Sequence, residues 1–88
     1  ESSTPRLVKG LRITPSTNGY IVYDARRERV HYLNHTAALV MDLCTGRNSL
    51  AEIVTLVGAA YGLPRKPARE VGALVRQLAG EGLIALDS

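Results

Sequence analysis

The chain has 88 residues, of which 45% are hydrophobic and 22% are charged, and its formal net charge is +3. This balance predicts one globular domain with a modest core and excludes an intrinsically disordered chain. The single cysteine, Cys44, excludes an internal disulfide framework. No apolar run reaches the ~18 residues of a membrane helix and no secretory signal is present. We therefore expect a cytoplasmic protein with no membrane partner.

Short strands are predicted first. We expect residues 1–6 to form a flexible N-terminal tail and residues 7–86 to form the domain. Segments of β-forming residues, separated by turn signals such as Pro15 and the Asn18-Gly19 pair, predict three strands. The expected strands are residues 7–13, 20–23 and 30–33, with a turn at 14–19 and a charged stretch at 24–29. The second and third are close enough to form an antiparallel hairpin.

The segment from Val30 to Gly46 links the strands to the helices. The period of the pattern changes at Asn34, a favoured N-cap residue. From Ala37 to Cys44 every residue except Asp42 is apolar, which predicts a short helix buried on almost all sides. Gly46 supplies a left-handed stop. A strand that runs directly into a buried helix joins the sheet to the helical core.

Two more helices are predicted after Gly46. Ser49 and Glu52 form a capping-box pattern at the start of the second helix, which ends at Gly62. Its apolar residues recur at helical spacing and are Leu50, Ile53, Val54, Val57 and Tyr61. The third helix opens near Pro67 and stops at Gly82, with a core stripe of Val71, Leu74, Val75 and Leu78. Residues 83–86 form either a closing strand or a core plug. The order predicts an α+β fold in which three N-terminal antiparallel strands precede a three-helix cluster.

The third helix has two different flanks beside its core stripe. One carries Glu70, Gln77 and Glu81, and the other carries small residues edged by arginines. The second flank consists of Ala68, Gly72, Val75 and Ala79 with Arg69 and Arg76. Small residues beside cations suit a peptide backbone that lies close to the helix. They equally suit close packing against a neighbouring element, and the two interpretations are compatible.

Residues that would carry catalysis or hold a metal are sparse. His31 and His35 flank the cap and do not form a tetrahedral metal site with one distant cysteine. Cys44 lies within the predicted buried helix, where a small core residue is the favoured interpretation over a nucleophile. The sequence has no glycine-rich phosphate loop and no strand-elbow serine. We therefore predict no enzymatic activity, no metal and no cofactor.

Several motifs in their order along the chain resemble those of the PqqD-like family. They are Tyr20-Ile21-Val22-Tyr23-Asp24, Leu33-Asn34-His35-Thr36-Ala37-Ala38, Gly46, Glu52-Ile53, Tyr61-Gly62 and Leu78-Ala79-Gly80-Glu81-Gly82-Leu83. The segment from Leu33 to Ala38, followed by a glycine eight residues later, is the most specific part. His35 stands where the family often has proline, and the turn at 25–29 lacks the glycine that is common there.

The resemblance implies a winged-helix-like fold and a precursor-peptide recognition element for ribosomally made, modified peptides. Such proteins are peptide chaperones that bind a leader segment by strand addition and present it to a modifying enzyme, here a radical SAM enzyme, a cyclase or a leader peptidase. The pathway stays open between a quinone cofactor, a lasso peptide and another modified peptide. By position, the docking strand would be Arg29, Val30, His31, Tyr32 and Leu33. The helix side would be Ala68, Gly72, Val75 and Ala79, with Arg69 and Arg76 paired to leader acids.

The alternative function is that of a winged-helix DNA-binding regulator. Such a domain contacts bases with one exposed helix and phosphates with several basic side chains. The second predicted helix has no Lys or Arg between Leu50 and Tyr61, and the third offers Arg69 and Arg76 beside Glu70 and Glu81. The distribution of charge therefore favours a peptide partner and no nucleic acid.

Overall fold

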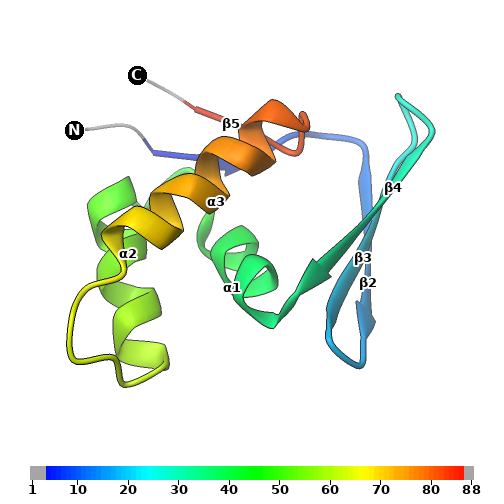
Figure 1. Cartoon of the computed structure of the whole chain (residues 1–88). Coiled ribbons are helices and arrows are strands. Elements are labelled where there is room, and N and C mark those ends of the chain that lie inside the picture. Colours follow the sequence, from blue (N-terminus) through cyan, green and yellow to red (C-terminus); the bar gives the residue numbers. More distant parts are fainter. Residues whose placement is uncertain (1–3, 87–88) are drawn as a thin grey trace.

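A computed structural model describes residues 4–86 of the chain (Figure 1). The elements are β1 (Arg6–Leu7), β2 (Leu11–Ser16), β3 (Gly19–Asp24), β4 (Arg29–Asn34), α1 (His35–Leu43), α2 (Leu50–Ala60), α3 (Ala68–Gly80) and β5 (Ile84–Ala85). Strands β2, β3 and β4 form an antiparallel sheet in that order. The predicted α+β class, with three antiparallel strands ahead of three helices, is confirmed.

The two predicted caps start α1 and α2. The side chain of Asn34 accepts a hydrogen bond from the backbone N–H of Ala37 at 2.9 Å. At α2, the N–H of Ser49 donates to Glu52 at 2.6 Å and the N–H of Glu52 donates to the Ser49 hydroxyl at 3.1 Å. Each pair satisfies backbone donors that have no partner within the helix, so the caps fix where the helices begin.

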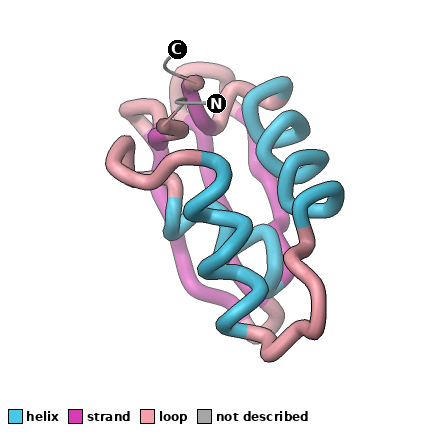
Figure 2. Tube along the Cα trace, turned by 90° about the vertical axis from the view of Figure 1, so that its left-hand side faces the viewer, coloured by secondary structure: helices cyan, strands magenta, loops and turns pink. Residues whose placement is uncertain are grey.

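Helix α1 lies at the centre of the molecule, as the apolar run from Ala37 predicts. It contacts β3, β4, α2 and α3, and Ala37, Ala38, Val40 and Met41 are buried. Figure 1 shows α1 beneath α3, between α2 and the sheet. From the side, the helices form a layer in front of the strands (Figure 2). None of the helices within residues 4–86 has the length and hydrophobicity that crossing a membrane would require.

The segment predicted as one first strand, residues 7–13, is divided in the structure. Gly10 adopts a left-handed conformation with φ 88° and separates β1 from β2. β1 leaves the main sheet and pairs with β5, in the register Arg6↔Ala85 and Leu7↔Ile84. The single-strand prediction was wrong because β1 is fixed by a segment more than 70 residues away. That pairing also makes β5 the closing strand that was one of the two predicted alternatives.

The first turn is shorter than predicted. β2 continues through Pro15 to Ser16, and only Thr17 and Asn18 connect it to β3. β2 is an edge strand, so Pro15 can lie opposite Tyr20 without the N–H that a central strand would need.

Part of the predicted N-terminal tail is packed against the domain. Its residues 1–3 lie outside the described residues. Pro5 is buried, and its carbonyl accepts a hydrogen bond from the N–H of Gly46 at 2.9 Å. Residues 5–7 therefore belong to the folded domain.

Candidate functional site

Strand β4 has an unpaired edge within the described residues. It pairs with β3 on one side, and no other strand of residues 4–86 pairs with its second side. Its side chains alternate: Leu33 is 9% exposed and faces the helices, whereas Val30 and Tyr32 are 48% and 79% exposed on the outer face. An unpaired edge presents backbone donors and acceptors to any chain that can pair with it.

Two observations show which backbone groups of β4 point outward. A Cβ on Gly19 would collide with the carbonyl oxygen of Leu33, so that oxygen is directed toward β3. On the other side of β3, Pro15 lies opposite Tyr20 and has no N–H to donate. The pair of Pro15 with Tyr20 is therefore a non-hydrogen-bonded pair, and the backbone groups of Tyr20 point toward Leu33 on β4. Because hydrogen-bonded and non-hydrogen-bonded pairs alternate along an antiparallel ladder, the N–H and C=O groups of Val30 and Tyr32 are those at the free edge.

One flank of α3 lies across from β4. Nδ1 of His31 is 3.7 Å from a carboxylate oxygen of Glu81, the residue that follows α3. Counting back from Glu81 at helical spacing gives Gln77, Leu74 and Glu70 on the same flank. The end of α3 thus lies beside β4; we infer that the rest of this flank faces the β4 edge, and we call the space between them the cleft.

The helix residues predicted for the site lie on a different flank of α3 from Glu81. Gly72 stands nine residues from Glu81, which at about 100° per residue places it on the opposite side of the helix. It is buried, and a Cβ there would lie 3.4 Å from the Arg76 guanidinium. Val75 is 3% exposed in the core, and Ala79 packs partly against it. Ala68, Arg69 and Arg76 are exposed. On the small-residue flank, Gly72, Val75 and Ala79 are thus covered at least in part by the core or by Arg76, whereas Ala68 is open to solvent.

The predicted strand residues do lie together. Arg29, Val30, His31, Tyr32 and Leu33 all belong to β4. Of these, His31 is the side chain that reaches into the cleft, since 13% of it is exposed and it faces Glu81. Its Nε2 is buried and has no hydrogen-bond partner among residues 4–86.

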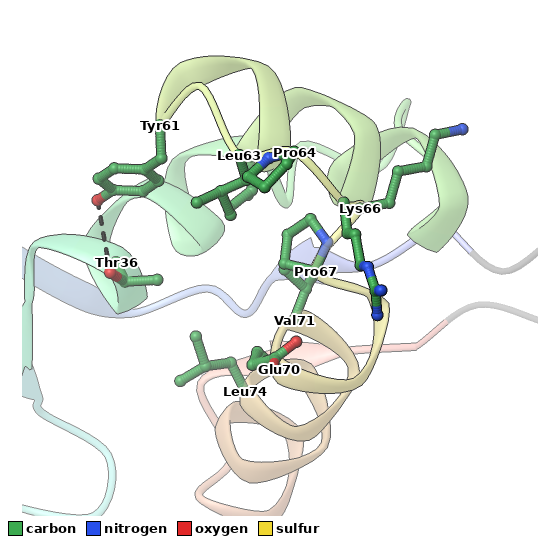
Figure 3. A pocket seen from close by; sticks show the side chains of 11 residues that line it. Thr36, Tyr61, Leu63, Pro64, Lys66, Pro67, Glu70, Val71 and Leu74 are labelled. Atoms are coloured by element: carbon green, nitrogen blue, oxygen red, sulfur yellow. Dashed lines mark hydrogen bonds between the residues drawn. The ribbon is translucent and has the colours of Figure 1, made fainter.

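A pocket of about 670 Å³ lies where β4 passes into α1 (Figure 3). It is formed by α1, the end of α2, the 62–67 loop and the first half of α3. The lining residues are Thr36, Val57, Tyr61, Leu63, Pro64, Arg65, Lys66, Pro67, Glu70, Val71 and Leu74. The Thr36 hydroxyl donates to the Tyr61 hydroxyl at 3.4 Å on one side of it.

Sequence reasoning missed this pocket. It placed Tyr61 and Leu74 in core stripes, but Tyr61 is 46% exposed and Leu74 is only partly buried. The loop from Leu63 to Pro67, with two prolines among five residues, was the available signal. Because Glu70 and Leu74 also belong to the flank that faces β4, the pocket continues the cleft toward α1.

Among residues 4–86, two groups have shifted pKa values, Cys44 and Tyr20. Burial raises the pKa of the Cys44 thiol from 9.0 to about 11. The hydrogen bond from Tyr20 to Asp42, at 2.8 Å, raises the pKa of the Tyr20 hydroxyl. Within the described part of the chain, His, Cys, Asp and Glu form no group of three that could hold a metal ion. The cleft therefore offers backbone pairing, an apolar pocket and charged rims.

Comparisons with known proteins agree with this architecture. A solved structure described as "Lasso peptide synthetase B1 complexed with the leader peptide" matches with a TM-score of 0.77 and 26% sequence identity. The match covers 93% of this chain and 98% of that one. A search of curated protein sequences found no match. The profile of the family described as "Coenzyme PQQ synthesis protein D (PqqD)" matches residues 19–84. Since this match spans three quarters of the sequence, from Gly19 to Ile84, the chain belongs to the PqqD family.

Proposed function

We propose that this protein binds the leader segment of a ribosomally made precursor peptide, as a further strand on the free edge of β4. The observation that carries the proposal is the unpaired β4 edge, whose outward groups are those of Val30 and Tyr32, opposite α3. The structural match to a lasso peptide synthetase described as complexed with its leader peptide supports it.

Strand addition separates affinity from selectivity. Backbone hydrogen bonds to the outward groups of β4 would hold a leader of any sequence, and alternate side chains would distinguish one leader from another. Side chains that point inward would meet His31, Leu74 and the pocket beside Thr36. We place the helix wall at Glu70, Leu74, Gln77 and Glu81, in place of the small-residue flank.

We assign the protein a recognition role without chemistry of its own. It would present the bound leader to a modifying enzyme, whether a radical SAM enzyme, a cyclase or a leader peptidase. Because the precursor is ribosomally made, this meeting takes place in the cytoplasm. A leader orders as it docks and loses conformational entropy, so we expect a Kd between high nanomolar and micromolar.

Calorimetry tests the proposal, with the leader of a short precursor gene identified beside the gene for this protein as the peptide. Tyr32→Pro removes an outward N–H and should abolish binding while the domain stays folded. Tyr32→Ala is the matched control, because it removes the same ring but keeps the N–H, and should retain most of the affinity. His31→Pro removes an N–H directed to β3 and should unfold the sheet, which circular dichroism would detect.

Two results would reject the proposal. One is the absence of heat with wild-type protein at ~100 µM peptide. The other is equal binding by wild type and a folded Tyr32→Pro variant, because the leader would then not be paired with β4.

A further inference from the structure

The β3–β4 hairpin end of the sheet carries a concentration of positive charge. The turn between the strands contributes Arg26 and Arg27, and the sheet register places Arg29 and Arg12 beside it. The turn at Lys9 and Gly10 reaches the same place, because a Cβ on Gly10 would lie 3.6 Å from the Arg26 side chain. We call Lys9, Arg12, Arg26, Arg27 and Arg29 the basic cluster; all five are exposed.

The acids around the basic cluster neutralise it only in part. Asp24 is fully buried, and one of its carboxylate oxygens accepts a hydrogen bond from the Arg26 N–H at 3.1 Å. Glu28 is exposed within the turn itself. The third acid is Glu81, which reaches this end from α3. Figure 1 shows the hairpin end extending beyond the helices, so a partner can approach it.

Glu81 lies where the cleft meets the basic cluster. Its carboxylate is 3.7 Å from His31 Nδ1, and its backbone carbonyl accepts a hydrogen bond from Arg27 at 3.4 Å. A peptide strand on the β4 edge must pass this point. In that arrangement the Glu81 carboxylate would lie close to a side chain of the docked peptide.

The basic cluster and the pocket beside Thr36 lie at opposite ends of β4. The sheet is antiparallel throughout, and purely antiparallel sheets are favoured. A peptide strand that pairs antiparallel with β4 would run from the pocket end toward Arg29. The six residues of β4 span roughly 17 Å at about 3.3 Å per residue, so about five peptide residues separate the two ends.

We propose that the basic cluster selects leaders that carry Asp or Glu about five residues C-terminal to the residue at the pocket, and that Glu81 competes with those acids. This proposal rests on the proposed leader binding and adds to it a preference for negative charge in the bound segment of the leader. Opposite charges at an exposed rim steer association and discriminate between partners. Removing the internal carboxylate should therefore strengthen binding of an acidic leader.

The test compares two peptides by calorimetry. One is the leader peptide named for the first test. The other is the same peptide with the Asp and Glu residues expected beside the basic cluster replaced by Asn and Gln. Arg29→Gln should weaken binding of the acidic peptide by roughly 2- to 5-fold, the range of an exposed ion pair. Glu81→Gln should tighten it by a similar factor. Because both residues line the proposed binding site, each change can also affect the neutral peptide, but its effect on the acidic peptide should be the larger one. The preference for the acidic peptide should decrease as salt is raised.

Arg47→Gln is the control, since Arg47 is exposed on the loop between α1 and α2 and loses the same charge. If Arg47→Gln weakens the acidic peptide as much as Arg29→Gln does, net charge and not the basic cluster is responsible, and the proposal is overturned. If both peptides bind equally, the proposal is overturned and leader binding stands. If neither peptide binds, the proposed leader binding and the proposed selection by the basic cluster both fail. If Arg29→Gln leaves leader binding unchanged but weakens capture of the purified modifying enzyme, the cluster contacts the enzyme and the proposal is overturned.

Discussion

At the scale of single residues, Asn34 explains why β4 ends where the cleft meets the pocket. Its side chain accepts from the Ala37 N–H, so the chain changes from strand to helix within one residue. This turn brings Thr36, in the first turn of α1, to the wall of the pocket. The cap therefore sets the length of the edge that a peptide could pair with.

Asp24 is the residue whose strand position and burial were predicted least well from the sequence. It was assigned to the charged stretch that joins two strands, but it is the last residue of β3 and is fully buried. One carboxylate oxygen accepts from Arg26, and the other has no hydrogen-bond partner among residues 4–86. A buried carboxylate at the base of the hairpin ties the basic turn to the sheet.

Cys44 allows a prediction about stability in alkaline solution. Its pKa is about 11 in the folded protein and 9.0 is the ordinary value, so from pH 9 to 11 the unfolded chain loses the thiol proton first. The folded state then binds more protons, and the free energy of unfolding should decrease with pH by up to about 3 kcal/mol. Urea unfolding at pH 8, 9, 10 and 11 measures the decrease.

Cys44→Ala is the control for this prediction. It should be less stable at pH 8, because it leaves a small cavity, but its stability should decrease less between pH 9 and 11. The raised pKa of Tyr20 acts in the same direction and should account for part of the remaining slope. Parallel curves for wild type and Cys44→Ala would show that the thiol does not contribute.

At the scale of elements, α3 separates core, cleft and solvent around its circumference. Val71, Val75 and Leu78 are buried, and Leu74 lies at the boundary between the core and the pocket. Arg76 lies over Gly72 on the far side. The rotation of this one helix therefore decides which side chains a docked peptide could contact.

Leu74→Ala and Arg76→Ala test the rotation of α3. If the helix wall is the one proposed, Leu74→Ala should weaken leader binding by about 1–2 kcal/mol, the value of a partly buried apolar contact. Arg76→Ala should change it by less than about 0.5 kcal/mol. Calorimetry measures both, and thermal melting checks that Leu74→Ala, whose side chain also packs partly on the core, is folded at the assay temperature. The opposite ranking would restore the flank of Ala68, Gly72 and Ala79.

At the scale of the whole molecule, the charge distribution distinguishes a peptide from DNA. Five of the eleven Lys and Arg residues form the basic cluster at the hairpin end, while α2 contains none. On α3, Arg69 and Arg76 are accompanied by Glu70. No helix of the described chain thus presents the row of cations with which a recognition helix and its neighbours hold phosphates.

We expect duplex DNA to bind weakly and to be released as the salt concentration rises to ~0.2 M, because phosphate contacts depend on counterion release. The leader should lose less affinity over the same range, since backbone pairing and the pocket are not ionic. Fluorescence anisotropy with a labelled random duplex and a labelled leader measures both. A sequence-specific DNA complex that survives ~0.2 M salt would favour the DNA-binding regulator.

Features that depend on neighbouring residues were determined by the sequence alone. The caps at Asn34 and at Ser49 with Glu52 formed as predicted, because each is a contact between residues three apart. The buried character of α1 followed from its continuous apolar run. Together with the order of strands and helices, these local signals were enough for the fold class, whereas the choice of the docking strand came from the family resemblance.

Features that depend on distant residues were decided only by the tertiary structure. The pairing of β1 with β5 divides the first predicted strand, and no local pattern specifies it. The flank of α3 that lies beside His31 is set by how the helix packs on α1 and the core. The helical wheel and the family resemblance contain no such packing, and they favoured the flank of small residues. The pocket and the basic cluster likewise exist only where separate segments meet, since side chains define a site by their positions in space.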